Sequence, residues 1–251
     1  MMIKLTTKCS MGCNHCISNC TKDGIDMDFE TFQRVLDFQK ELNLPIDMLI
    51  ISGGEPTEHE NFIQFIGYLL TRMQQDLKDL IVLVTTNGLW ISEHMDFVNE
   101  IYKNVGKRFS FQIVVDDRYY PIHVDEEKLK HPSIMVCNGV SSIYPQGRAL
   151  TNKLPSNRIS PQCFNVRAIS KQLTNPTLRD VVLNQLSNGH HCTPHIDTDG
   201  SIKLGESSLC PPCSSIYKSM DEIQDNIISF KCHQCDFLTD KLGDVYKKFV
   251  Q

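Results

Sequence analysis

Cysteine is the residue type whose number and spacing in this sequence most directly suggest chemistry. The chain has 251 residues and eleven cysteines, most of them in one group before residue 21 and another after residue 190. A thiolate is both a nucleophile and a ligand for zinc and for iron–sulfur clusters. The N-terminus lacks the apolar core of a signal peptide, which argues against export, and a reducing compartment does not favour disulfides. The cysteines therefore indicate metal binding or catalysis in a protein that we expect to be cytoplasmic.

The first group contains Cys9, Cys13 and Cys16 in the pattern C-x3-C-x2-C. Three thiolates in a loop after a short strand can face one point. Four cysteines close a [4Fe–4S] cluster, whereas three leave one iron open to another ligand. Zinc is the alternative for this group, with Cys20 or His15 as the fourth ligand, although zinc sites favour C-x2-C pairs.

A second motif, Gly53-Gly54-Glu55-Pro56, follows the next expected strand. Together with the three cysteines it resembles the radical S-adenosylmethionine (SAM) superfamily, over roughly residues 1–150. The resemblance implies a [4Fe–4S] cluster on those cysteines, whose open iron binds the methionine part of SAM. It also implies that one electron, from a donor such as flavodoxin or ferredoxin, cleaves SAM to a radical that abstracts a hydrogen atom from the substrate.

The resemblance further implies which residues hold SAM. His15 stands where the family usually has an aromatic residue beside the adenine, and the glycines receive the methionine amino group, because a backbone without Cβ can approach a ligand closely. Arg148 is expected to pair with the methionine carboxylate, for which a guanidinium fork is well shaped. Asp116 is expected to touch the ribose or the substrate. The cofactor-binding residues expected in this way are Gly53, Gly54, Glu55, Pro56, Thr85, Asn87, Asp116, Arg148 and His15.

The second cysteine group allows two interpretations. In the first, Cys210 and Cys213 form one C-x2-C pair, and Cys232 and Cys235 form another after 18 intervening residues. This spacing is within the range of a zinc ribbon, which is a closed structural site without redox chemistry.

The other interpretation starts from Cys192. With Gly205 and Cys210 it forms the pattern C-x12-G-x4-C, which resembles the start of the SPASM and twitch extensions that bind auxiliary [4Fe–4S] clusters in radical SAM enzymes. Five cysteines support one such cluster, as in the shorter twitch form. We favour this interpretation over zinc. The implied ligands are Cys192, Cys210, Cys232 and Cys235, with Cys213 as an alternative.

Three cysteines lie outside both ligand sets. Cys163 follows Pro161 in an irregular stretch, and a thiol there could donate a hydrogen atom in catalysis, although a small buried residue is the simpler interpretation. Cys137 lies in an expected strand and is interpreted as a core residue, and Cys20 as a loop or core residue.

The elements that would position these residues alternate between strand and helix over the first 140 residues. Such alternation predicts a parallel sheet with right-handed crossovers, whose functional groups gather at the carboxyl ends of the strands. The polar stretches of the sequence follow the expected strands, so we expect one site at that edge. The expected strands are 3–7, 47–51, 80–85, 109–115 and 133–137, and the expected helices are 28–43, 61–73 and 92–104.

The pattern changes after about residue 150. We expect a radical SAM core at 1–150, an irregular connection at 151–189 and a twitch-like domain at 190–251. The last part predicts a hairpin from 191–196 and 201–204 with a turn at Asp199-Gly200, and short helices at 221–228 and 240–249. The expected fold class is thus α/β, a partial (β/α) barrel with parallel strands and a small Cys-rich cap that contains a β-hairpin.

Composition limits the remaining classes of function. The net charge is −5, from 25 basic and 30 acidic residues, which argues against a nucleic-acid partner. The sequence has no run of 18 apolar residues that would suggest a membrane span.

We expect a radical SAM oxidoreductase that oxidises a small polar metabolite by two electrons, with the auxiliary cluster assisting. Peptide modification such as cross-linking is the alternative, and a non-enzymatic zinc-binding adaptor is a second one.

Overall fold

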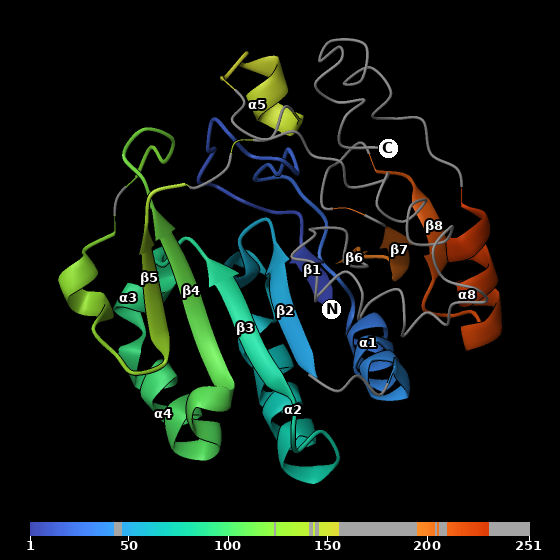
Figure 1. Ribbon diagram of the computed structural model, residues 1–251. Coiled ribbons are helices and arrows are strands. Elements are labelled where there is room, and N and C mark those ends of the chain that lie inside the picture. The colour runs from blue at the N-terminus through green and yellow to red at the C-terminus, as the bar shows by residue number, and fades with distance from the viewer. Residues whose placement is uncertain are drawn as a thin grey trace, which may run out of the picture.

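The centre of the fold is β1 (Met2–Thr6), a short strand with apolar residues on one face. The computed structural model describes residues 1–42, 47–122, 124–140, 143, 146–155, 195–203, 205 and 210–230. Within them β1 pairs in parallel with β2 on one side and with β6 on the other. The strands form one eight-stranded sheet in the order β5-β4-β3-β2-β1-β6-β7-β8 (Figure 1).

Five parallel neighbours make up the first part of the sheet, as the alternation of strand and helix predicts. Ile3 and Leu5 on β1 are fully buried against the helices, whereas the opposite face of the strands carries more polar side chains. The strands after β1 in this part are β2 (Met48–Gly53), β3 (Ile81–Thr86), β4 (Phe109–Val115) and β5 (Ile134–Asn138).

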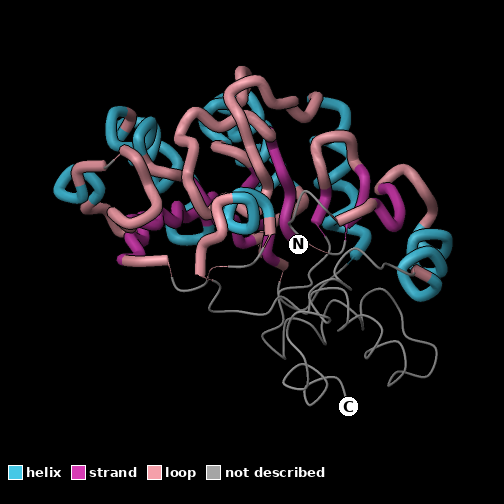
Figure 2. The backbone as a smooth tube through the Cα atoms, turned by 90° about the horizontal axis from the view of Figure 1, so that it is seen from above, coloured by secondary structure: helices cyan, strands magenta, loops and turns pink. Residues whose placement is uncertain are grey.

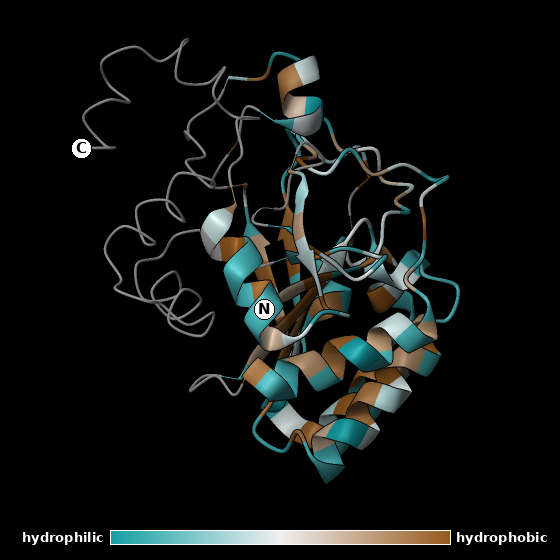
Figure 3. Cartoon of the chain, turned by 90° about the vertical axis from the view of Figure 1, so that its right-hand side faces the viewer, coloured by the Kyte–Doolittle hydropathy of each residue, from teal (hydrophilic) through white to brown (hydrophobic). Residues whose placement is uncertain are grey.

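Helices cover one face of the sheet and leave the other to the loops above it (Figures 1 and 2). Each long helix turns an apolar side to the strands, and Figure 3 shows helices with hydrophobic and hydrophilic sides next to largely hydrophobic strands. Their aromatic residues pack together, for example Phe32 of α1 and Phe65 of α2, whose rings lie 4.8 Å apart. The helices in this part are α1 (Phe29–Leu42), α2 (Phe62–Gln75), α3 (Leu89–Glu93) and α4 (Met95–Val105), with 3₁₀ turns at η1 (Pro56–Glu58), η2 (Gly106–Arg108) and η3 (Glu126–Leu129).

Two helix starts show how local sequence sets these boundaries. Asp28 caps α1, since its carboxylate accepts from the backbone N–H of Thr31 at 2.7 Å. The single helix expected at 92–104 is instead two, because Gly88 takes a left-handed conformation that starts α3 early and His94 interrupts the chain before α4. The ring of His94 stacks on that of Trp90 at 3.9 Å at this break.

The C-terminal strands continue the same sheet. The hairpin expected after residue 190 is present as β6 (His195–Ile196) and β7 (Ser201–Lys203), and β8 (Pro212–Ser215) adds a further antiparallel strand that the sequence did not indicate. α8 (Met220–Ser229) begins with a capping box between Ser219 and Glu222. The helix expected at 240–249 lies outside the described residues, and the domain boundaries near 150 and 190 stay predictions.

Above the sheet, the short helix α5 (Gly147–Thr151) lies over the loop that follows β1 (Figure 1). No helix of the described residues is long and apolar enough to cross a membrane.

Candidate active site

The loop after β1 holds the first cysteine group at the carboxyl edge of the sheet. Its two ends are tied together, because the N–H of Cys9 donates to the carbonyl oxygen of Thr21 and the ammonium of Lys8 pairs with Asp26. The loop forms one wall of a cleft of about 680 Å³. Of the expected site residues, the cleft is lined by Cys9, Cys13, Cys16, His15, Gly53, Gly54, Glu55, Thr85, Asn87 and Arg148.

The three thiols are half-buried and close enough to affect one another. Burial raises the pKa of Cys13 to about 12, and the charges of Cys9 and Cys16 add to this effect. Cys16 is the exception, since a hydrogen bond from Cys20 holds its pKa below the usual range. Among the described residues, no three His, Cys, Asp or Glu side chains converge closely enough to hold a single metal ion. All three thiols line the same cleft.

Gly53 and Gly54 bring β2 into direct contact with the cysteine loop. The N–H of Gly54 donates to the carbonyl oxygen of Thr6 at 2.7 Å, and the N–H of Glu55 donates to that of Lys8 at 2.7 Å. A Cβ on Gly54 would lie 1.9 Å from the Lys8 oxygen, and one on Gly53, where φ is +139°, would lie 2.2 Å from the Thr6 oxygen. Glycine is therefore required here by the packing of backbone on backbone.

Glu55 is buried and connects the ends of two strands. One carboxylate oxygen accepts from Thr86 Oγ1 at 2.6 Å and from the hydroxyl and N–H of Thr57, and the other accepts from the N–H of Asn87 at 2.6 Å. Burial raises the pKa of Glu55, whereas these donors act to lower it. The side chain thus fixes the end of β3 against the segment after β2, and its carboxylate still lines the cleft.

Arg148 holds the cysteine loop from above. Its Nε donates to the carbonyl oxygen of Cys13 and its Nη1 to that of Cys20, both at 2.8 Å, and its backbone N–H donates to Cys16 O. Its Nη2 is buried, has no partner among the described residues, and belongs to a side chain that lines the cleft. The arginine expected to bind a carboxylate therefore has two of its three nitrogen atoms committed to backbone carbonyl oxygens and one, Nη2, available.

His15 is packed between two tyrosines on the same wall. The rings of Tyr119 and Tyr120 lie 5.2 Å from its ring, and its Nδ1 is buried without a partner among the described residues. Burial lowers the pKa of His15, because it disfavours the charged form of the ring.

Asp116 and Pro56 are the two expected cofactor-binding residues that do not line the cleft. The Asp116 carboxylate accepts from the Arg118 guanidinium at 2.6 and 2.8 Å and from the N–H of Val140 at 2.6 Å. These bonds hold its pKa well below the usual range. Asp116 thus connects the loop after β4 to the loop after β5 through these hydrogen bonds. Pro56 is buried at the start of η1.

Several cleft residues were not expected from the sequence. Gln112 and Cys137, on neighbouring strands β4 and β5, both line the cleft, and the Gln112 amide lies 3.7 Å from Cys137 Sγ. The interpretation of Cys137 as a core residue is therefore wrong, and the period-2 alternation of β5 was the signal that could have shown it. Glu58 was also missed, although its carboxylate accepts from the N–H and the hydroxyl of Ser10, next to Cys9.

The second cysteine group is described only in part. Cys210 is buried. Cys213 packs against the hydrophobic core, and its thiol donates to the carbonyl oxygen of Ile202 at 3.2 Å. The other cysteines expected at this site or in catalysis, Cys192, Cys232, Cys235 and Cys163, lie outside the described residues.

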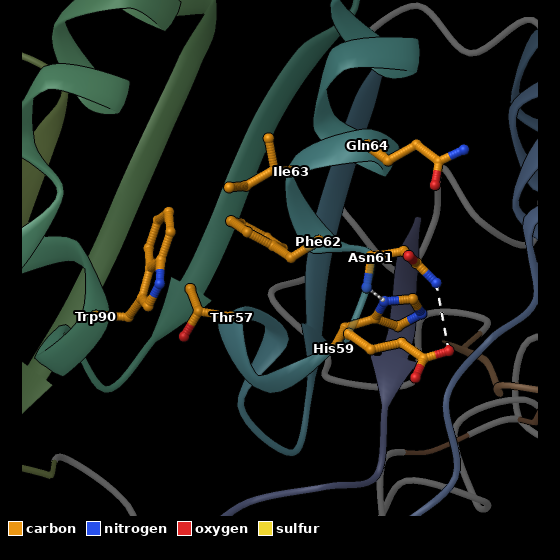
Figure 4. Close-up of a pocket in the computed structure, with 8 residues that line it drawn as sticks. Thr57, His59, Asn61, Phe62, Ile63, Gln64 and Trp90 are labelled. Atoms are coloured by element: carbon orange, nitrogen blue, oxygen red, sulfur yellow. Dashed lines mark hydrogen bonds between the residues drawn. The ribbon is translucent and has the colours of Figure 1, made fainter.

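A second hollow of about 460 Å³ lies at the start of α2 (Figure 4). Phe62 and Trp90 face it from one side, and His59 and Asn61 from the other. Both ring nitrogens of His59 are engaged, with Met27 O at 2.8 Å and with the N–H of Asn61 at 3.0 Å. No cysteine lines this hollow, so the chemistry belongs to the first cleft.

Comparison with known proteins agrees with this site. Residues 3–114 match the family model of the radical SAM superfamily, so this part of the chain is a radical SAM domain. Among the curated proteins compared, none matches the chain. Two similar solved structures are of the anaerobic sulfatase-maturating enzyme anSMEcpe. The first contains bound AdoMet and a Cp18Cys peptide, and it matches this chain with 12% sequence identity and a TM-score of 0.42. The second contains bound AdoMet, and it matches with 14% sequence identity and a TM-score of 0.43. In both comparisons the match covers 92% of this chain and 80% of the other chain.

The assignment to this enzyme superfamily rests on the family model, because similarity at these TM-scores is weak. The prediction of a radical SAM enzyme from the cysteine and glycine motifs is confirmed, and so is the α/β partial barrel with mostly parallel strands.

Proposed function

We propose that the chain binds a [4Fe–4S] cluster through Cys9, Cys13 and Cys16, cleaves SAM in the adjoining cleft, and oxidises a substrate there. The observation that carries the proposal is the shared cleft, which brings these three thiols together with the glycine segment and with two unpartnered nitrogen atoms. Three thiols that line one cleft suit a cluster that leaves one iron open to another ligand.

The chain's own residues fit SAM beside that cluster. When bound, the cluster and SAM supply a strong carbon-centred radical once one electron arrives. Arg148 Nη2 is a charged donor without a partner and is suited to the methionine carboxylate, and the ring of His15, which lines the cleft, offers a flat face to the adenine. Thr85 and Asn87 complete the cofactor wall from the end of β3. The electron donor would be a protein such as flavodoxin or ferredoxin, and the cytoplasm would be the compartment.

An auxiliary [4Fe–4S] cluster on Cys192, Cys210, Cys232 and Cys235 is part of the proposal. The thiol of Cys213 supports this set, because it is hydrogen-bonded to the Ile202 carbonyl oxygen and packed in the core. A zinc ribbon would need Cys213 as a ligand, so its orientation favours the set that omits it.

An oxidation follows from two redox sites in one chain. Bound SAM would supply a radical that takes one hydrogen atom from a substrate carbon, with 5′-deoxyadenosine as the by-product. The auxiliary cluster would accept one further electron from the substrate, and one proton would pass to solvent, which would complete a two-electron oxidation. A small polar metabolite is the substrate class that we propose. A peptide is the alternative, and the nature of the substrate that supports turnover decides between the two.

The first test is the iron content and SAM cleavage of the anaerobically purified protein, beside a variant with Cys9, Cys13 and Cys16 all changed to Ala. We expect about eight irons per parent chain and about four per variant chain. With dithionite as the reductant, the parent should form 5′-deoxyadenosine and the variant should not.

Two results would contradict parts of the proposal. About four irons and one zinc in the parent, with zinc alone in the variant, would make the C-terminal site a ribbon and remove the second redox site. A colourless, zinc-containing parent that ignores SAM would support the adaptor alternative and overturn the proposed function altogether.

A further inference from the structure

β5 is an edge strand of the sheet, and its carboxyl end lies at the cleft. The described strands end with β5 beside β4 on one side and with β8 beside β7 on the other (Figure 1). Cys137 of β5 lines the cleft, and so do Gly139 and Val140, which follow the strand. Anything that lies along β5 therefore reaches the cleft at the end of the strand.

The backbone of β5 directs alternate residues toward β4. The carbonyl oxygen of Ser133 accepts from an N–H of β4, and the N–H of Gly139 donates to a carbonyl oxygen at the end of β4. The pairing between these two bonds has no register shift, so the N–H and C=O groups of Val136 and Asn138 point away from β4. Within the part of the chain that the structure describes, those groups have no hydrogen-bond partner.

The two edges of the sheet differ in how they are protected. Sheets commonly protect an edge strand from further pairing with a proline, a lysine or a bulge. β8 has two of these features, because it begins with Pro212 and its pairing with β7 contains a register shift. β5 (Ile134–Asn138) contains neither a proline nor a charged residue, and it pairs with β4 without a shift. The edge of β5 is thus suited to accept another strand.

We propose that an extended peptide binds along the outer edge of β5 as an added strand and places one of its residues in the cleft beside Cys137. An extended backbone is the partner that matches unpaired N–H and C=O groups at strand spacing. Met135 pairs in register with Gln112, a cleft residue, so its side chain lies on the cleft face, where it is 49% exposed. An apolar side chain of the peptide would pack against Met135.

The role of that peptide as the substrate rests on the proposed function, in its peptide alternative. Binding at β5 does not depend on turnover and can be tested by itself. The probe is an array of short random-sequence peptides, incubated with the anaerobically purified protein. We expect wild type to select a set of peptides, and the strongest of these then serves for measurements of affinity in solution.

Val136→Pro removes an N–H that points away from β4, which leaves the ladder with β4 intact. We expect the affinity for the selected peptide to fall by roughly tenfold or more, because one backbone hydrogen bond is lost and the proline ring obstructs the added strand. Val136→Thr keeps that N–H and is the matched control, with the affinity of wild type. Met135→Pro should lower Tm more than Val136→Pro does, because the N–H of Met135 points toward β4.

N-methylation of the selected peptide, one residue at a time, tests the proposal even if Val136→Pro does not fold. Methyl groups on alternate residues should abolish binding and those between them should not, since only alternate N–H groups of an added strand face β5. Equal affinity in wild type and Val136→Pro, no peptide selected by wild type, or no alternation among the methylated peptides would overturn the proposal. So would a wild-type dimer that Val136→Pro separates, because a second copy would then occupy the edge. Loss of SAM cleavage in wild type with peptide binding intact would contradict the proposed function alone.

Discussion

Arg148 lies with its Nε 2.8 Å from the carbonyl oxygen of Cys13, although 135 positions separate the two residues in the chain. The same guanidinium reaches Cys20 O, and a Cβ on the preceding Gly147 would lie 2.3 Å from Cys16 O. α5 is therefore seated directly on the cysteine loop. The shape of the loop depends on a segment that belongs to a distant part of the sequence.

Arg148→Lys tests this contact, because lysine keeps the charge but cannot donate to two carbonyl oxygens in a fixed fork. We expect slower cluster assembly and at least a tenfold loss of SAM affinity. Iron retention after gel filtration and equilibrium binding of SAM measure these effects. Arg34→Lys is the control, because Arg34 also forks between a carboxylate, that of Glu41, and a carbonyl oxygen, that of Ile216, but does not line the cleft, and it should keep the SAM affinity of wild type. If Arg148→Lys bound SAM as tightly as wild type, the positive charge alone would account for SAM binding, and the fork to the two carbonyl oxygens would not be needed.

Gly54→Ala should destabilise the protein by roughly 2 kcal/mol or more, because the new Cβ would overlap the Lys8 carbonyl oxygen. Gly67→Ala is the matched control, since Gly67 lies within α2 with nothing within 4 Å of the added Cβ. It should stabilise the protein by roughly 0.5–1 kcal/mol, as alanine favours a helix over glycine. Urea unfolding of both variants measures the difference, and equal effects would refute the steric argument.

Glu55→Gln keeps the shape of the side chain but replaces one acceptor oxygen with an amide that donates. In either orientation the amide NH2 group, itself a donor, would face another donor. One orientation places it against the N–H of Asn87, and the other places it against the hydroxyl of Thr86 and the hydroxyl and N–H of Thr57. We expect a loss of about 2–3 kcal/mol in the free energy of unfolding, with SAM binding reduced as well. Glu93→Gln, at an exposed glutamate of α3, should have no measurable effect.

Asp116 predicts a pH dependence. Its pKa in the folded state is well below its value of about 3.9 in the unfolded chain, mainly because Arg118 hydrogen-bonds to it. The folded state therefore gains stability above pH 4 and loses it as the pH falls through the folded pKa. Asp116→Asn should lower the urea midpoint at pH 7, and the gap to wild type should narrow below about pH 4. The exposed Asp23→Asn should show no gap at either pH.

Cys210→Ser and Cys213→Ser distinguish the two interpretations of the C-terminal site. Under the auxiliary-cluster proposal, Cys210→Ser should fall from about eight irons to about four, whereas Cys213→Ser should keep about eight. Cys213→Ser should also be slightly less stable, because its buried thiol donates to Ile202 O and packs in the core. Equal metal loss in both variants would favour a ribbon instead.

The alternation of strand and helix was enough to predict the first five strands, their parallel arrangement and the edge at which the cleft lies. It could do so because each strand ends in a polar stretch and each helix has one apolar side. The pairing of β6 with β1 and the presence of β8 were not predicted, since β6 has two residues and β1 is almost two hundred residues away from it in the chain. Pairing at that distance leaves no local pattern.

In the site, too, residues that belong to a local sequence motif were predicted, and residues whose contacts are made elsewhere in the chain were not. Cys9 and Gly54 were predicted as site residues because each belongs to a short motif, the three spaced cysteines in one case and the paired glycines in the other. Asp116 was interpreted as a ribose contact from its place after β4, but Arg118, two residues later, takes its carboxylate. Glu58 was missed because nothing near it in the chain indicates Ser10, 48 positions earlier.

The distance between Arg148 and the loop also has a consequence for biosynthesis. A ribosome completes the cysteine loop long before it reaches the arginine that clamps it, at about 5–20 residues per second. During that interval of several seconds or more, the nascent chain presents its first thiols without α5 over them. Iron delivery during translation would therefore meet a loop that Arg148 does not yet fix, whereas delivery to the finished chain would reach the thiols through the cleft with the loop already held in place.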